Sequence, residues 1–196
     1  MLKALVGLGN PGARYDATRH NVGWWLVDLL KRRWSATPFQ EEDLWLRSRA
    51  ELSEVGEVWL IKPLTYMNRS GIAVRALLEY EPLDLEHDVL IVVDDVALEP
   101  GRPRFRARGS AGNHNGLQSI EDVLGTREYA RLRIGVGAPP AGVELADWVL
   151  SEFDDPEDED AVLELLPRLS EAVELWAREG VEAAMNRYNA PLSDDE

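Results

Sequence analysis

One segment of this chain, HDVLIVVDD at residues 87–95, restricts the possible folds more than any other. Its run of five apolar residues has no polar face, so both faces of the strand that it forms must be covered. Such a strand lies in the middle of a sheet that carries helices. The run ends in Asp94 and Asp95, so two carboxylates stand where the predicted strand leaves the core.

Strand and helix patterns alternate along the chain. Short apolar or alternating runs, bounded by turn residues, predict further strands at 2–8, 58–63, 102–108 and 131–137. Apolar residues at helical spacing predict helices at 21–34, 70–80 and 115–124. This order predicts an α/β fold, a single domain in which helices flank a twisted mixed β-sheet.

The C-terminal quarter begins with the acidic stretch 153–160, which suits a helix start because acids are favoured at the positive end of the helix dipole. One face of the helix that follows is apolar: Val162, Leu165, Leu166, Leu169, Val173 and Trp176. A second short helix is predicted at 181–187. We expect both helices to dock on the body of one domain, residues 1–190, and residues 191–196 to form an acidic, disordered tail.

The composition excludes several kinds of chemistry. There is no cysteine among the 196 residues, which rules out disulfides, thiolate nucleophiles and cysteine-bound metals. H-E-x-x-H spacing and a G-x-S-x-G turn are both absent, so neither a zinc hydrolase nor a serine acyl-enzyme is supported. No apolar run approaches the ~20 residues of a membrane-spanning helix. We expect a cytoplasmic protein that needs no metal or cofactor and does not contact a membrane.

The negative charge is unevenly distributed. The formal net charge is −15, and residues 151–196, with 15 acidic and 3 basic residues, account for −12 of it. Residues 102–133 instead contain seven arginines and three acids, a net charge of +4. Because partners respond to local patches more than to total charge, this basic strip leaves a polyanionic partner possible.

The segment GLGNPG at residues 7–12 is a G-x-G-x-x-G sequence directly after a predicted strand. A dinucleotide-binding turn would require a helix to start within the glycines. Here Pro11 and Gly12 lead into a stretch without helical periodicity, and the acid expected about 20 residues later, Asp28, lies inside the predicted helix 21–34. We therefore favour a polar ligand-binding loop, with Asn10 at the carboxyl end of the strand.

Residues suited to hydrolysis occur at several predicted strand ends. His20 stands just before a helix, where the dipole helps to keep imidazole neutral and basic, and Asp94 could fix its tautomer. Asn68 and Asn115 offer amides that suit carbonyl oxygens. Each residue alone is more often a cap or a turn residue. Together they favour a His–Asp pair that activates water against an electrophilic carbonyl, with asparagine amides holding the substrate or oxyanion.

Arginines occupy every second position of RPRFRAR at 102–108, so in a strand they project from one face, opposite to Phe105. Arg131 and Arg133 repeat this spacing in the next predicted strand. Two interpretations are open. The rows suit a charged edge strand, which Pro103 favours, and they equally suit a phosphate backbone beside a hydrolytic site.

The same motifs, in the same order, closely resemble the bacterial peptidyl-tRNA hydrolase family. The first, G-L-G-N-P-G-x-x-Y-x-x-T-R-H-N-V-G at residues 7–23, is long and highly specific. It is followed by TYMNRSG, the strand-end aspartate, the A-G-x-H-N-G loop, RLRIGVG and MNRYN, so that the resemblance covers nearly the whole chain.

The resemblance implies a monomeric, cofactor-independent esterase that cleaves the bond between a stalled peptide and its tRNA. It implies that His20 activates water and that Asp94 orients His20. It also implies a set of substrate-binding residues, which are Asn10, Tyr15, Met67, Asn68, His114 and Asn115. Arg106 and Arg133 correspond to the family's residues that hold a tRNA phosphate.

Two departures from the family pattern bear on these expectations. Asn113 stands where family members often have glycine, which would stiffen or reshape the loop that carries His114. The acidic C-terminal region is heavy for a tRNA-binding protein and puts affinity more than chemistry in question. A noncatalytic relative that only binds RNA is the alternative, against which the intact His20, Asp94 and asparagines argue.

Overall fold

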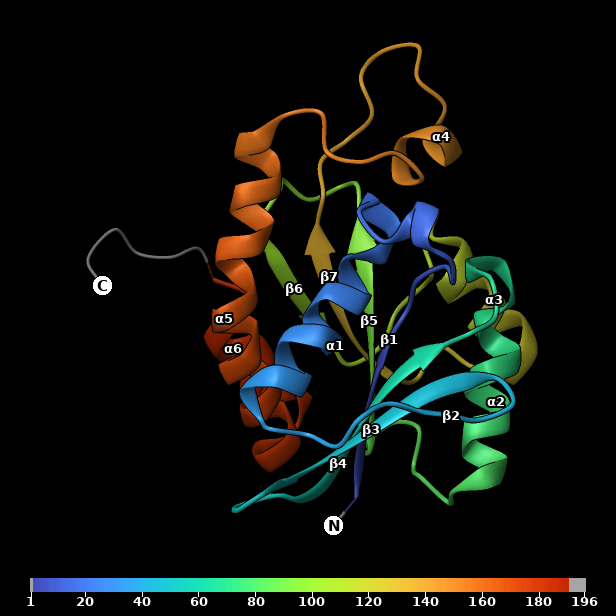
Figure 1. Cartoon of the computed structure of the whole chain (residues 1–196), viewed down its shortest axis with the longest axis vertical. Coiled ribbons are helices and arrows are strands. Elements are labelled where there is room, and N and C mark those ends of the chain that lie inside the picture. The colour runs from blue at the N-terminus through green and yellow to red at the C-terminus, as the bar shows by residue number, and fades with distance from the viewer. Residues whose placement is uncertain (1, 191–196) are drawn as a thin grey trace.

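The computed structural model describes residues 2–190, and Figure 1 shows a central sheet between two groups of helices. The sheet has seven strands in the order β2-β3-β4-β1-β5-β7-β6. Strands β4, β1, β5 and β7 run parallel, whereas β2, β3 and β6 are antiparallel to their neighbours. The strands are β1 Lys3–Gly7, β2 Gln40–Glu41, β3 Trp45–Leu52, β4 Gly56–Pro63, β5 Val89–Asp95, β6 Pro103–Arg106 and β7 Ala130–Gly135.

The apolar run of β5 lies at the centre of this sheet, as predicted. It pairs with β1 on one side and β7 on the other, and residues 89–93 are completely buried. Leu90 and Val92 point into the core on one face, while Val89, Ile91 and Val93 point into the core on the other. The absence of a polar face in the sequence thus follows from two separate cores, one on each side of the sheet.

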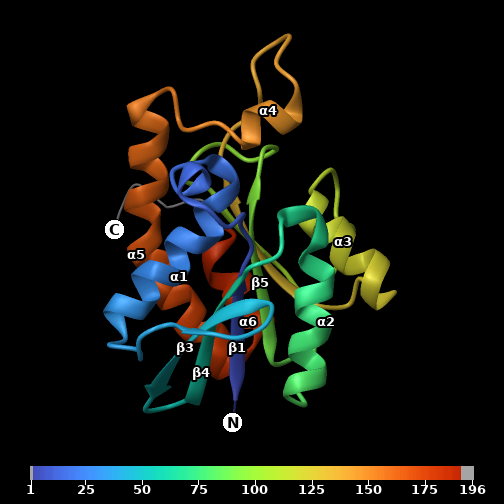
Figure 2. The same ribbon diagram turned by 45° about the vertical axis from the view of Figure 1, so that its right-hand side comes forward.

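Different helices cover the two faces (Figure 2). One core is closed by α1, α5 and α6, and the other by α2 and α3. The helices predicted from periodicity are confirmed within a few residues. Their bounds are α1 Val22–Arg33, α2 Ser70–Tyr80, α3 Asn115–Leu124, α5 Pro156–Glu179 and α6 Val181–Tyr188.

The two C-terminal helices dock on the body, as expected. All six apolar residues named for α5 are buried, and the Asp155 side chain caps the helix by accepting from the Glu157 N–H at 2.9 Å. After α6, Asn189 exchanges two hydrogen bonds with the backbone of Phe105 and so covers part of the edge strand β6. The tail expected at 191–196 lies outside the described residues. Across residues 2–190, no helix combines the length and apolarity needed to cross a membrane.

Two strands and one α-helix were not predicted from the sequence. Strands β2 and β3 form one edge of the sheet, and the short helix α4, Leu145–Val149, lies at the carboxyl ends of the parallel strands. Strand β3 is hard to recognise because a charged residue, Arg47, occupies one of its buried positions, where its guanidinium stacks on the ring of Trp59. Helix α4 has five residues, too few to show a period.

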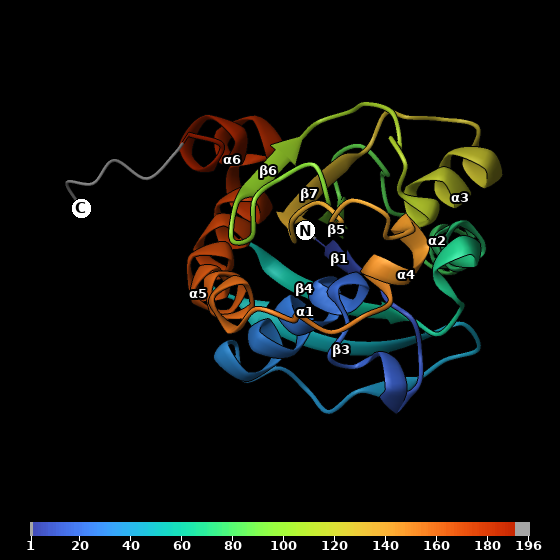
Figure 3. The ribbon, with the colours of Figure 1, turned by 90° about the horizontal axis from the view of Figure 1, so that it is seen from above.

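The parallel strands all point their carboxyl ends to one edge of the sheet, and Figure 3 looks onto that edge. The short 3-10 helices Arg19–Asn21 and Met67–Arg69 lie there, together with the glycine-rich loop at 109–114 and α4. The fold therefore gathers segments that are distant in sequence at the place where open α/β sheets bind ligands.

Candidate active site

A buried polar cluster at this edge consists of His20, Asp94 and His114. Asp94 is the penultimate residue of β5 and is 2% exposed. Its Oδ1 atom lies 2.7 Å from Nδ1 of His20 and 2.9 Å from Nε2 of His114. One carboxylate oxygen thus joins the 3-10 helix before α1 to the start of α3.

The remaining hydrogen bonds of His114 define the proton positions. Its Nδ1 accepts from the backbone N–H groups of Gly116 at 3.1 Å and Leu117 at 3.2 Å, so this nitrogen carries no proton. Nε2 must then carry the proton and donate it to Asp94. Burial lowers the pKa of His114, and the opposing attraction of Asp94 is smaller, which keeps the ring neutral.

Asp94 is held in its ionised form. Burial by itself would raise its pKa, but the electrostatic effect and the hydrogen bonds of the two imidazoles outweigh it and lower the pKa far below its usual range. Because an ionised carboxylate can only accept, Nδ1 of His20 donates to it. In the neutral form of the ring, Nε2 of His20 is then the nitrogen without a proton, and residues 2–190 provide no hydrogen-bond partner for it.

Sequence reasoning placed His114 in the glycine-rich loop GSAGNHNG at 109–116, assigned it to substrate binding only through the family resemblance, and did not anticipate its contact with Asp94. The side chain of His114 is the N-cap of α3, with the two backbone N–H groups of the first turn directed at its ring. A histidine immediately before a predicted helix was the available signal. It is a weak one, because serine, threonine, aspartate and asparagine are the usual residues at that position.

The glycines of GLGNPG serve close packing of β1 against α1. A Cβ atom on Gly7 would collide with the carbonyl oxygen of Gly23, and one on Gly23 would lie 2.7 Å from that of Leu8. The chain continues after Gly12 into 3-10 turns, and α1 begins only at Val22. The glycines therefore do not place a helix N-terminus at a pyrophosphate, which agrees with the sequence-based rejection of a dinucleotide site.

Asn10 is held by a residue whose importance the sequence did not reveal. The side chain of the completely buried Asn21 exchanges two hydrogen bonds with the backbone of Asn10, at 2.9 and 3.0 Å. The Oδ1 atom of Asn10 accepts from the N–H of Met67 at 2.8 Å. Within residues 2–190 the Nδ2 group of Asn10 has no partner, so it is a donor available at this position.

Two cavities meet at His20 and Asn115, and we refer to them together as the cleft. The first, of about 440 Å³, is lined by Asn10, Tyr15, Met67 and Asn68. The second, of about 520 Å³, is lined by Asp94, Asp95, His114, Arg133 and Glu144. All residues predicted for catalysis and peptide binding therefore lie around one cleft, together with Arg133.

Helix α4 contributes Ala146 and Val149 to both cavities and thus covers the cleft. It is held by Arg19, the neighbour of His20. The Arg19 guanidinium lies 3.4 Å from the centroid of the Trp148 ring and donates to Ser151 Oγ at 2.6 Å and to the Glu152 carbonyl at 2.5 Å. Arg19 is 1% exposed, so it holds α4 in place and does not face a ligand.

The two arginine rows share one face of the sheet, because β6 and β7 pair with Arg104 beside Arg133 and Arg106 beside Arg131. Their surroundings differ. Arg104 and Arg106 are exposed and, within residues 2–190, form no ion pair. Arg131 is completely buried and donates to the backbone carbonyls of Gly109, Arg127 and Tyr129.

Arg106 lies outside the cleft, in an adjoining cavity of about 340 Å³ that we call the arginine cavity. Within residues 2–190 its lining consists of five arginines, one acid and two uncharged residues: Arg104, Arg106, Arg108, Arg131, Arg133, Asp95, Gly109 and Ser110. Asp95 and Arg133 line both the arginine cavity and the cleft. The two predicted phosphate ligands therefore lie in one basic cavity that adjoins the catalytic cluster.

His20, Asp94 and His114 are also residue types that bind metals, with one donor atom of each within 4.8 Å of the others. Their hydrogen bonds occupy these atoms differently. The two ring nitrogens that face Asp94 carry protons, and the other nitrogen of His114 accepts from two backbone amides. A metal ion would have to displace both protons, so the geometry favours a hydrogen-bonded network.

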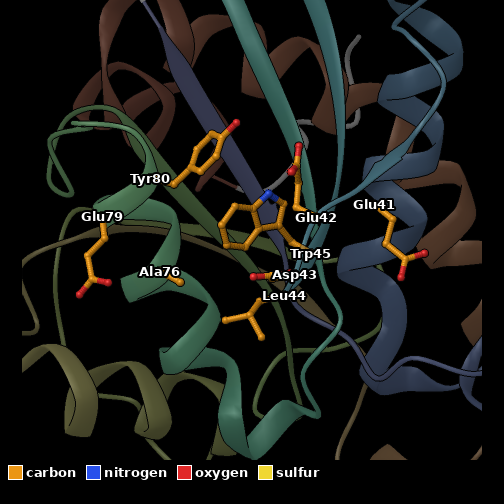
Figure 4. A pocket seen from close by; sticks show the side chains of 8 residues that line it. All are labelled: Glu41, Glu42, Asp43, Leu44, Trp45, Ala76, Glu79 and Tyr80. Carbon is orange, nitrogen blue, oxygen red and sulfur yellow. The ribbon is translucent and has the colours of Figure 1, made fainter.

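A larger hollow, of about 1090 Å³, lies between the far edge of the sheet and α2 (Figure 4). It is lined by Glu41, Glu42, Asp43, Leu44, Trp45, Ala76, Glu79 and Tyr80. Four acids and no base line it, so a polyanion would be repelled there. Size therefore does not identify the functional site in this protein.

Comparison with known proteins points to one family. The family described as peptidyl-tRNA hydrolase matches residues 4–195. A peptidyl-tRNA hydrolase of Symbiobacterium thermophilum is 50% identical, over 96% of this chain and 100% of that protein. One from Chloroflexus aggregans is 47% identical, over 94% and 97%. The crystal structure of peptidyl-tRNA hydrolase from Acinetobacter baumannii superposes with a TM-score of 0.88 at 32% identity, covering 96% of this chain and 95% of that one.

Proposed function

The chain belongs to the peptidyl-tRNA hydrolase family, and we propose that it hydrolyses the ester bond between a peptide and the 3′ end of a tRNA. One observation carries the proposed mechanism. The hydrogen bond between Asp94 and Nδ1 of His20 leaves the unprotonated Nε2 as a base in a cleft lined by asparagines. This arrangement suits the attack of water on an uncharged ester carbonyl.

In the proposed reaction, Nε2 of His20 takes a proton from a water molecule, and the water oxygen attacks the ester carbonyl carbon. The carbon–oxygen bond to the ribose breaks when the tetrahedral intermediate collapses, and the imidazolium returns its proton to the ribose oxygen. Asp94 stabilises the imidazolium by its negative charge and fixes the ring. His114 donates to the same carboxylate oxygen and thereby holds Asp94 in place.

The asparagines fit a separate role. Nδ2 of Asn10 is a free donor, and the amides of Asn68 and Asn115 line the cleft near His20. Amide donors stabilise the oxyanion of the intermediate and hold peptide carbonyls without introducing charge. Tyr15 and Met67 provide apolar surface along the same wall for the peptide.

The arginine cavity is proposed to bind tRNA phosphate through Arg106 and Arg133. Guanidinium groups match phosphate geometry, and the cavity adjoins the cleft in which the ester would lie. We further propose that the enzyme is a cytoplasmic monomer.

A single-turnover assay with peptidyl-tRNA in excess EDTA tests the function and the metal-free mechanism together. We expect release of the peptide by the wild-type enzyme, and retention of the ester by His20→Ala. Tight tRNA binding without peptide release would favour the noncatalytic RNA-binding alternative. Activity that is lost in EDTA and restored by zinc would overturn the metal-free mechanism.

A further inference from the structure

A single ion pair separates the catalytic cleft from the arginine cavity. Nη1 of Arg133 lies 3.2 Å from Oδ2 of Asp95, and these two are the residues that line both cavities. Their side chains are 14% and 12% exposed. Asp95 directly follows Asp94 in β5, yet its carboxylate pairs with Arg133 and forms no hydrogen bond to His20 or His114.

Among residues 2–190, Asp95 is the only acid that lines the arginine cavity, where it faces five arginines. Its other oxygen, Oδ1, accepts from the N–H of Ala97 at 2.9 Å, which fixes the carboxylate in its orientation. Arg133 uses further donors on the carbonyls of Ser110 and Ala111, at 3.0 and 3.3 Å. A phosphate that reaches Arg133 must therefore compete with a carboxylate that is already in place.

We propose that Asp95 is a specificity-determining residue that occupies Arg133 until a tRNA phosphate displaces it. The inference rests on the proposed function, in which Arg133 binds tRNA phosphate. A small anion would gain too little binding free energy from one guanidinium to displace a fixed carboxylate. A tRNA also contacts the exposed arginines of β6, and these contacts add to its binding free energy. The same competition weakens binding of the deacylated tRNA product, which keeps the phosphates but has lost the peptide.

Asp95→Asn tests this directly, because asparagine keeps an oxygen to accept from Ala97 while it removes the charge that faces Arg133. We expect the variant to bind deacylated tRNA about 3- to 10-fold more tightly, since an ion pair of this exposure has been removed from competition. Inorganic phosphate should also inhibit the variant at a correspondingly lower concentration. Asp122→Asn on α3 changes the net charge equally but lies outside the arginine cavity, and it should bind within about 2-fold of wild type.

The double variant Asp95→Asn/Arg133→Ala separates competition for Arg133 from a general charge effect. In the Arg133→Ala background, Asp95→Asn should give no further gain in tRNA affinity, because the residue that Asp95 occupies is gone. Thermal unfolding of each variant checks that the fold is retained.

Equal or weaker tRNA binding by Asp95→Asn would mean that Asp95 only positions Arg133, and would overturn the proposal. A gain that persists in the Arg133→Ala background would overturn it as well. Failure of the proposed function has a different signature, because the wild-type enzyme would then bind tRNA but release no peptide from peptidyl-tRNA.

Discussion

The catalytic cleft and the arginine cavity are neighbours, but their polar groups are arranged in opposite ways. In the cleft, His20, Asp94 and His114 are at least nine-tenths buried, and both histidines are hydrogen-bonded to Asp94. In the arginine cavity, Arg104 and Arg106 extend into solvent. The difference indicates that catalysis depends on side chains whose hydrogen bonds are formed before the substrate binds. Attraction of a polyanion depends instead on exposed charges that are not paired.

A second contrast exists within the arginine rows themselves. Strands β6 and β7 carry the same period-two spacing on the same face, yet Arg131 is completely buried while its register partner Arg106 is exposed. The reason is the place of each strand in the sheet. Strand β6 is an edge, whereas β7 lies between two strands. The β7 arginines donate to backbone carbonyls of the loop at 109–114, and Arg131 also donates to those of Arg127 and Tyr129.

The largest expected effect is on the cleft. His20→Ala should lower kcat by about 10²- to 10⁴-fold, the size of a general-base contribution, with KM and the thermal unfolding temperature nearly unchanged. His87→Ala is the matched control, because His87 is an exposed histidine paired with Asp84 far from the cleft. Near-normal turnover by His20→Ala would remove the base from the mechanism.

Asp94→Asn should cause a smaller loss of kcat that depends on the same histidine. Without the carboxylate, the ring of His20 loses its fixed tautomer and the partner of its imidazolium. The double variant with His20→Ala should therefore be no slower than His20→Ala alone. Losses that multiply in a steady-state assay would contradict a paired action of the two side chains.

The arginine rows can be separated by stability. Arg131→Ala should lower the free energy of unfolding by about 2–4 kcal/mol, because it leaves buried backbone carbonyls without donors. Arg106→Ala, its exposed register partner, should change that free energy by less than about 0.5 kcal/mol. Urea denaturation of both variants measures the difference, and equal values would show that burial does not distinguish the rows.

A pH-dependent stability is expected from His114. Because its folded pKa is lowered, the unfolded chain binds more protons below the ordinary value of 6.5. The free energy of unfolding should therefore fall as the pH drops below about 6.5, by at most about 1.4 kcal/mol per pH unit, until the folded pKa is reached. His114→Asn retains a good helix cap and should reduce this slope. A slope that is unchanged in the variant would assign the pH dependence to other groups.

The sequence was sufficient to predict which residues lie together at the cleft, but not which hydrogen bonds join them. Asp94 lies at the end of its strand, and Asn10 and Asn68 come after theirs. Because the carboxyl ends of parallel strands meet at one edge, periodicity was enough to bring these three residues together. The bond between His114 and Asp94 depends on how the loop at 109–114 closes, which no period encodes. Burial of Arg131 was hidden for a related reason, because alternation identifies the face of a strand but not what covers it.

The smallest effect expected is the salt dependence of tRNA binding, and it separates the free and the occupied arginine. Each phosphate contact that is lost should flatten the log–log salt dependence by about one unit. Arg106 has no ion pair within residues 2–190, so Arg106→Ala should lose close to this full amount. Arg133 is already paired with Asp95, so part of its positive charge is compensated by the carboxylate before a phosphate binds. Arg133→Ala should therefore flatten the salt dependence by less than Arg106→Ala does. Both variants should raise KM and leave the single-turnover rate at saturation nearly unchanged, since a phosphate contact acts in binding.

The acidic C-terminal region repels tRNA and is screened by the same salt, so the difference between variant and wild type is the quantity to compare. Wild-type slope and affinity in both variants would reduce the arginine rows to a charged sheet edge.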